Sequence, residues 1–231
     1  METTENPTTE VTNASKTKYE SIDDKIAKMK IAFDNASLPG IVEIMLTVGY
    51  TPEKIDSLKT RLVQLETLQQ VRTKEYADQL AETDKLEIKR AAIDMLFVTH
   101  RKLVKILFKG DIQAITALQV DALKPVSFAG WMQMALNFYQ QLSSVATFKT
   151  KVTGVGITNA VINNQLQELA ALQTLKNSQR KETAESQAAT DARDKAFDEL
   201  YPLYSEYIQY AKVLLPDNQA LEAIGVKVKA K

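Results

Sequence analysis

The sequence is short of the residues on which most catalytic and metal sites depend. It contains no cysteine and a single histidine among 231 residues. Disulfide scaffolds, thiolate metal sites and cysteine nucleophiles are therefore excluded, and so are His-rich zinc sites and the repeated Glu-x-x-His pattern of di-iron bundles. A calcium or magnesium site made only of carboxylates stays open, although no EF-hand spacing is present. Because no paired acid, base or nucleophile stands out, we expect a non-enzymatic protein with no cofactor and no metal.

Neither sign of charge dominates. Lys and Arg together number 29, as do Asp and Glu, so the formal net charge is zero. We expect no nucleic acid and no anionic membrane as partner. No apolar run approaches the roughly 18 residues of a membrane span, and the polar first residues, METTENPTTEVTNASKT, lack the apolar core of a signal peptide. The sequence as given predicts a cytoplasmic protein.

Glycine and proline are scarce too, with seven and six residues, which favours long helices. The clearest helix lies in residues 51–109, where Thr51–Glu53 form a typical helix start and Gly110 follows the end. Apolar residues recur at heptad spacing at both ends of this segment, but polar residues hold the same seam from Gln69 to Thr83. We predict one continuous helix. A hairpin broken near Thr83 is the alternative, disfavoured because no Gly, Asn or Pro lies there to make a tight turn.

A second copy of this pattern lies in the second half of the chain. A constant shift pairs Gly49 with Gly156 and Thr51 with Thr158, and one ungapped register spans about sixty residues. After a one-residue deletion the match resumes at Asp217. Helical periodicity alone would match the apolar positions, but not the shared Gly-x-Thr and Lys-Glu-x-Ala sequences. We infer an internal duplication of a unit that contains a medium helix, a short helix, a Gly-capped turn, a long helix and a short terminal helix.

The duplication predicts an all-α fold. We expect an elongated antiparallel helical bundle built from two tandem copies around a pseudo-two-fold axis, with the polar middles meeting at a hydrated waist. The predicted organisation is a flexible polar tail (1–17), a first repeat (18–120), a linker (121–127), a second repeat (128–228) and a basic tail (229–231). The expected helices are 18–35, 41–48, 51–109, 112–120, 128–144 and 158–215. The last of these has the same alternative break, near Thr190, and a candidate kink at Pro202.

Two aromatic groups are candidate interfaces. The helix at 128–144 is apolar almost all round, which predicts either complete burial or an interface with another chain. The residues that would form this interface are Trp131, Met132, Met134, Phe138 and Tyr139. A second group is a ladder of tyrosines at three-residue spacing, which predicts either core residues with boundary hydroxyls or a patch for a partner. Its members are Tyr201, Tyr204, Tyr207 and Tyr210. The lone His100 falls on the apolar seam and is predicted to be a core or boundary residue, not a base.

Four segments stand out as motifs: TVGYTPEKI (47–55), KILFKGDIQA (105–114), ATDARDKAFDELY (189–201) and LLPDNQALEAIGVKV (214–228). They resemble segments of a family of duplicated all-helical proteins of Bacteroidetes. The resemblance covers nearly the whole chain after the tail. It implies the same duplicated helical fold and a bacterial cytoplasmic setting. The family has no established activity, so the resemblance implies no functional residues.

Three functions are compatible with this sequence. The first is a non-enzymatic structural protein that self-associates into a homo-oligomer or a larger assembly. The second is a helical adaptor or chaperone-like module that presents a groove to a partner protein. The third is a membrane-acting helical bundle, which we rank below the other two because no long apolar or Gly-rich insertion segment is present.

Overall fold

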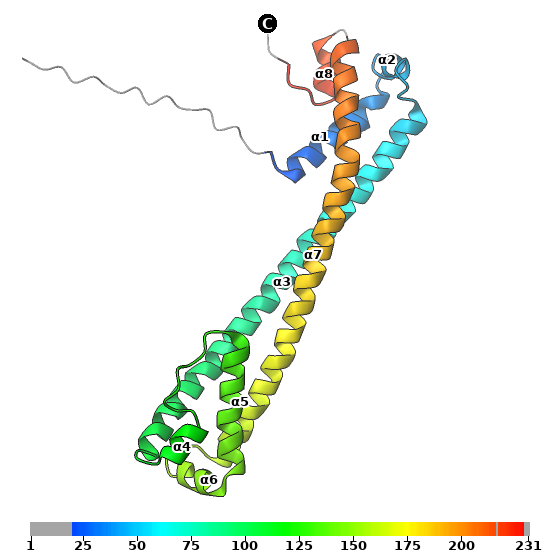
Figure 1. Ribbon diagram of the computed structural model, residues 1–231. Helices are drawn as coiled ribbons and strands as arrows, with labels where there is room; N and C mark the ends of the chain where they lie inside the picture. The colour runs from blue at the N-terminus through cyan, green and yellow to red at the C-terminus, as the bar shows by residue number, and fades with distance from the viewer. Residues whose placement is uncertain (1–19, 216, 229–231) are drawn as a thin grey trace, which may run out of the picture. The chain divides into compact units, whose positions relative to one another are not determined.

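The computed structural model describes residues 20–215 and 217–228 (Figure 1). Over these residues the protein consists of α-helices and one short 3₁₀ turn, with no strand, which confirms the predicted all-α class. The tails predicted at 1–17 and 229–231 lie outside the described residues.

Two helices of 56 residues each dominate the chain, α3 (Pro52–Leu107) and α7 (Asn159–Leu214). Both run unbroken through the positions of the alternative hairpins, so the prediction of continuous helices is confirmed and the hairpin alternative is wrong. Neither helix contains glycine, and the proline of α3 is its first residue, where no backbone N–H is needed. α7 continues past its internal Pro202.

The chain forms two compact units, and each unit contains parts of both long helices. The terminal unit comprises residues 1–67 and 195–231, and the central unit comprises residues 68–194. These spatial units therefore cut across the two repeats predicted from the sequence, because each long helix contributes one end to one unit and the remainder to the other.

The terminal unit surrounds the first turns of α3 and the last turns of α7 with shorter helices. These are α1 (Ile22–Asp34), continued by the 3₁₀ turn at Asn35–Ser37, then α2 (Val42–Leu46) and α8 (Asn218–Ala223). α1 begins four residues after the predicted start at Lys18, because Ser21 and Asp24 form a capping box there. One apolar core joins all of them, with Met29, Phe33, Met45, Tyr50, Leu65, Tyr207 and Ala211 among its buried residues.

The two long helices run antiparallel in the terminal unit. The ring of Tyr50, just before α3, lies 5.1 Å from that of Tyr207 near the end of α7. Further along α3, Arg61 shares a surface hollow with Leu200, which comes earlier in α7. Each step forward along α3 is thus a step backward along α7.

The central unit adds three helices to its parts of α3 and α7. They are α4 (Ile112–Ala117), α5 (Phe128–Ser144) and α6 (Ala146–Thr153). The bounds of α5 match the prediction, and the Ser127 hydroxyl caps it by accepting a hydrogen bond from the Gly130 N–H at 3.2 Å. The core of this unit includes Phe97, Val104, Phe108, Trp131, Phe138, Tyr139, Leu142 and Leu169.

The long helices are antiparallel here as well, and the segment predicted as a linker packs on α3. Lys89 pairs with Glu168 at 2.5 Å, and Gln179 donates a hydrogen bond to Thr83 at 3.4 Å. Residues 121–127 lie inside the central unit. There the Arg101 guanidinium donates to the Ala122 carbonyl at 2.8 Å, which fixes this segment against the helix.

The helix bounds support the predicted duplication, which stays a prediction. α3 and α7 have equal lengths, and the interval between their starts equals the interval between their ends and that between Gly49 and Gly156. The interval between α4 and α8 is shorter by a single position, as the predicted one-residue deletion requires. The glycine before each long helix adopts the left-handed conformation, with φ of 81° at Gly49 and 82° at Gly156.

The positive φ of Gly156 predicts a measurable cost for any side chain. Gly156→Ala is expected to lower the free energy of unfolding of the central unit by about 1 kcal/mol. No atom lies within 4 Å of the added methyl group, so backbone strain alone causes the loss. Trp131, the only tryptophan of the chain, is buried in the same unit, and its fluorescence during urea unfolding measures the effect.

Gly154→Ala is the matched control, two residues earlier. Gly154 has φ −66° and ψ −17°, and an added methyl group meets only the Lys151 carbonyl at 3.4 Å. This variant should be as stable as the natural chain or slightly more so. Equal losses of unfolding free energy in the two variants would contradict the explanation by backbone strain at Gly156.

Candidate interaction surfaces

The residues of α5 predicted as an interface are buried inside the central unit. Trp131, Met132, Met134, Phe138 and Tyr139 all belong to its core. The Trp131 Nε1–H donates to Asp94 of α3 at 2.7 Å, and the Asn137 side chain donates to the Ala117 carbonyl of α4 at 3.3 Å. The neighbouring helices cover the apolar residues of α5, while polar positions such as Gln133 and Gln140 stay exposed. The five predicted interface residues are therefore core residues of the chain itself, and the prediction that they form an exposed interface is wrong.

The tyrosine ladder passes from the core to the surface. Tyr207 is buried between Phe33 and Tyr50, and its hydroxyl finds no partner among the residues described. Burial raises the pKa of Tyr207 to about 12. Tyr201 and Tyr204 are half-buried, and Tyr210 is 41% exposed. Only the last position of the ladder is thus an exposed residue, and its ring still contacts that of Tyr50.

His100 and Tyr139 form a buried polar pair. The His100 Nδ1 lies 2.9 Å from the Tyr139 hydroxyl oxygen. Burial lowers the pKa of His100 and raises the pKa of Tyr139. Both groups are consequently neutral near pH 7, with the tyrosine O–H donating to the imidazole. The pair stabilises the core, as the position of His100 on the seam predicts, and it is not placed to act as a base on a substrate.

The polar middle of α3 meets α7 directly. The buried Arg193 donates from Nη1 to the Gln69 side-chain oxygen at 2.9 Å, and Gln179 reaches both Thr83 and Thr183. Direct side-chain contacts therefore replace water in at least this part of the predicted waist.

The residues that could hold a cation are three glutamates beside this seam. Glu75, Glu182 and Glu185 place carboxylate oxygens within 4.8 Å of one another. Lysines pair with two of them, Lys74 with Glu75 at 3.1 Å and Lys181 with Glu185 at 3.2 Å, and the charge of Glu182 also helps to raise the pKa of Lys181. Exposed carboxylates that form ion pairs with lysines do not by themselves make a metal site. We therefore assign no metal to this cluster.

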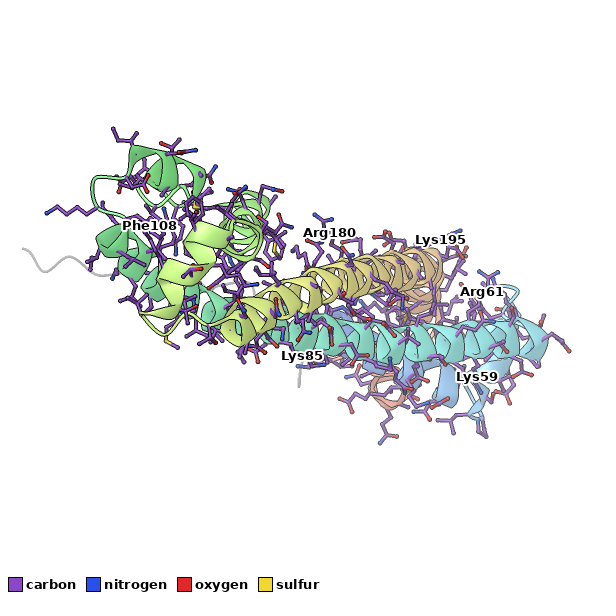
Figure 2. The ribbon with its side chains drawn as sticks, turned by 90° about the horizontal axis from the view of Figure 1, so that it is seen from below. Lys59, Arg61, Lys85, Phe108, Arg180 and Lys195 are labelled. Carbon is purple, nitrogen blue, oxygen red and sulfur yellow. The ribbon has the colours of Figure 1, made fainter. Side chains whose placement is uncertain are left out.

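A continuous stripe of exposed side chains follows the outer face of α3 in the central unit. Ile88, Met95 and Ile106 are 64%, 67% and 74% exposed. At 3.6 residues per turn they lie within about 20° of one line along the helix. Figure 2 shows Lys85 at the surface of this helix, whereas Phe108 lies among the side chains of the central unit. We call the line of Ile88, Ala92, Met95, Thr99, Lys102 and Ile106 the α3 stripe; all six are exposed.

A basic groove lies between α1 and α7 in the terminal unit. Its volume is about 290 Å³. Three lysines and two half-buried tyrosines line it together with Glu20; they are Lys25, Lys28, Lys212, Tyr201 and Tyr204. Sequence reasoning missed both surfaces. The stripe had a signal, since its 4-3 spacing is visible in the sequence, whereas the groove joins segments that are far apart along the chain.

The buried histidine predicts a loss of stability in mild acid. The unfolded chain binds a proton at an ordinary histidine pKa of about 6.5, whereas the folded chain does so only at lower pH because burial lowers the pKa of His100. The unfolded state therefore holds more protons below this value, so the unfolding free energy decreases as the pH falls from about 7.5 toward 5. Urea unfolding followed by Trp131 fluorescence measures this decrease.

His100→Gln supplies the control for this pH dependence. His100 is the only histidine, and carboxylates titrate mainly below this range, so the variant should lose most of the slope between about pH 5 and 7.5. If the unfolding free energy of both chains changed equally with pH, His100 would not be the cause of the pH dependence. Tyr139→Phe should lower stability at pH 7 by about 1–3 kcal/mol, because the imidazole then lacks its buried donor.

No protein-family model matches the chain, and no curated protein or solved structure matches it either. None of the helices in the described part of the chain combines the length and the apolar character needed to cross a membrane. The resemblance to helical proteins of Bacteroidetes stays a prediction.

Proposed function

We propose that this is a non-enzymatic structural protein that associates with a second copy of itself through the α3 stripe. The observation that carries the proposal is the exposure of large apolar side chains along one line of a long, regular helix. Ile88, Met95 and Ile106 each expose most of their side-chain surface. Large apolar side chains aligned in this way mark interaction sites far more often than isolated ones do.

The spacing of the stripe is that of a helix–helix seam. Its six positions follow at intervals of four, three, four, three and four residues, as the a and d positions of a coiled coil do. α3 already uses its inner seam, which contains Ile93, Phe97 and Val104, to pack inside the central unit. A second seam on the outer face supports a second helical partner.

The charges beside the stripe favour an antiparallel second copy. Asp84 and Glu87 lie at its N-terminal end, whereas Lys102, a member of the stripe, lies near its C-terminal end. Helical geometry places these three on the same side of the line through Ile88 and Ile106. In a two-fold contact between antiparallel helices, the acidic end of each copy faces the basic end of the other. An adaptor that binds a different protein does not require this self-complementary arrangement, which is why we place the homo-oligomer first.

The same proposal includes the predicted cytoplasmic setting. A cysteine-free chain is compatible with a reducing compartment. The location of the contact differs from the expectation, because the apolar residues of α5 that suggested self-association are buried and the stripe on α3 takes their place.

Charges introduced into the stripe should separate the two copies. Ile88→Glu combined with Met95→Glu places four charges in a two-fold contact and is expected to raise the dissociation constant by about 100-fold, at roughly 0.7 kcal/mol for each charge. Light scattering after size exclusion, from about 1 to 200 μM, should show twice the chain mass of 25.8 kDa for the natural protein and the single mass for the variant.

Val213→Glu is the matched control, since Val213 is 82% exposed on α7 and lies outside the stripe. This variant should retain the natural dissociation constant, and circular dichroism should show unchanged helicity in all chains. A natural chain that stays at 25.8 kDa throughout the same concentration range would refute the proposal. A dimer that survives both charges would also refute it.

A further inference from the structure

The described chain begins inside the basic groove. Glu20 is the first described residue, lines the groove and forms an ion pair with Lys28. Residues 1–19 are therefore attached at this place, and any group on them is held near the groove by a short tether. For short flexible tethers the effective concentration is in the millimolar range.

Two of the lysines in the groove have no carboxylate partner in the described parts of the chain. The Lys25 ammonium lies over the rings of Phe197 and Tyr201, at 5.4 Å and 5.2 Å from their centroids. Lys212 forms no ion pair with any described residue. With Lys28 matched by Glu20, the lining keeps an excess of two positive charges. Such a lining binds an acidic group, and the aromatic floor offers apolar contact to the chain that carries it.

The N-terminal segment of the protein has the complementary charge. From Met1 to Ser15 it contains Glu2, Glu5 and Glu10 and no Lys or Arg, and Lys16 and Lys18 follow in the stretch that leads to Glu20. We propose that the basic groove binds this acidic N-terminal segment of the same chain. The ten residues from Glu10 to Glu20 can span up to about 33 Å, so distance does not prevent Glu10 from reaching the lysines of the groove. Bound in this way, the segment covers the tyrosines on the rim of the terminal unit.

Cross-linking of the full-length chain tests this contact, because the natural sequence contains no cysteine that could interfere. Thr9→Cys marks the segment beside Glu10, and Ser205→Cys marks the groove. Mild oxidation at about 1 μM should form an intramolecular disulfide, seen as a faster band on a non-reducing gel. The comparison pair is Thr9→Cys with Ser57→Cys, which is exposed on α3 of the terminal unit. We expect the pair in the groove to react at least tenfold faster.

Charge variants separate specific binding from simple tethering. Lys25→Glu with Lys212→Glu should reduce the rate to that of the comparison pair, and Lys212→Glu alone should reduce it in part. Lys59→Glu with Lys195→Glu, which changes two lysines of the same unit outside the groove (Figure 2), should leave the rate unchanged. About 0.5 M salt should slow the reaction in the groove, because it screens exposed charges.

Three results would overturn the proposal. Equal rates for Ser205→Cys and Ser57→Cys would show that tethering alone brings the segment to the groove. If charge reversal of Lys25 and Lys212 left the cross-linking rate unchanged, electrostatic attraction would not explain the binding of the segment. Cross-links only between two chains would assign the groove to the segment of another molecule. Since the intramolecular reaction needs no second copy, its outcome is independent of the self-association through the α3 stripe.

Discussion

The structure depends on the antiparallel pairing of α3 and α7 along an incomplete apolar seam. An unbroken apolar seam would let the two helices slide past one another, since one heptad resembles the next. Here the seam of the central unit changes from apolar residues such as Phe97 and Ile93 to polar ones such as Thr83 and Gln69. A slip by one heptad would take the buried Arg193 away from Gln69 and place it opposite Tyr76. Arg193 would keep its ion pair with Asp194 of the same helix but would lose the acceptor of its Nη1. Because a buried donor without an acceptor is costly, the polar contacts set the register that the apolar residues leave open.

The same incompleteness explains why each unit needs short helices. Two helices that touch along one narrow seam bury too little apolar surface to offset the entropy of ordering them. α5 supplies most of the missing surface in the central unit, and α4 and α6 enclose it. In the terminal unit, α1 contributes Met29 and Phe33, and the turn before α3 contributes Tyr50. The short helices are thus part of the core, and the seam positions the elements on which they pack.

Local signals in the sequence predicted the helices well, because those signals act over a few residues. The helix start at Thr51, the glycine at 156 and the lack of breakers near Thr83 are each read from neighbouring positions, and the structure agrees with them. Burial of α5 could not be read in this way. Whether an apolar helix is buried or forms an interface depends on how many other helices pack against it. The periodicity of a sequence does not contain this number. Tyr207 gives the same lesson, since its burial requires Phe33 and Tyr50 from the other end of the chain.

Many of the polar and charged groups are paired within the chain, whereas apolar and basic side chains stay open at two surfaces. His100 and Tyr139 satisfy each other in the core and are held neutral, and lysines pair with two of the three glutamates in the cluster. Burial also raises the pKa of Tyr207 in the other core, whereas the exposed lysines with raised pKa values, such as Lys74 and Lys181, owe the shift to the carboxylates that they contact. Other groups stay open at the surface, where Lys25 and Lys212 face the basic groove with no carboxylate partner among the described residues, and Ile88 and Met95 face solvent. Folding leaves favourable contacts unmade at these two surfaces, so they are where another segment or another copy gains most by binding.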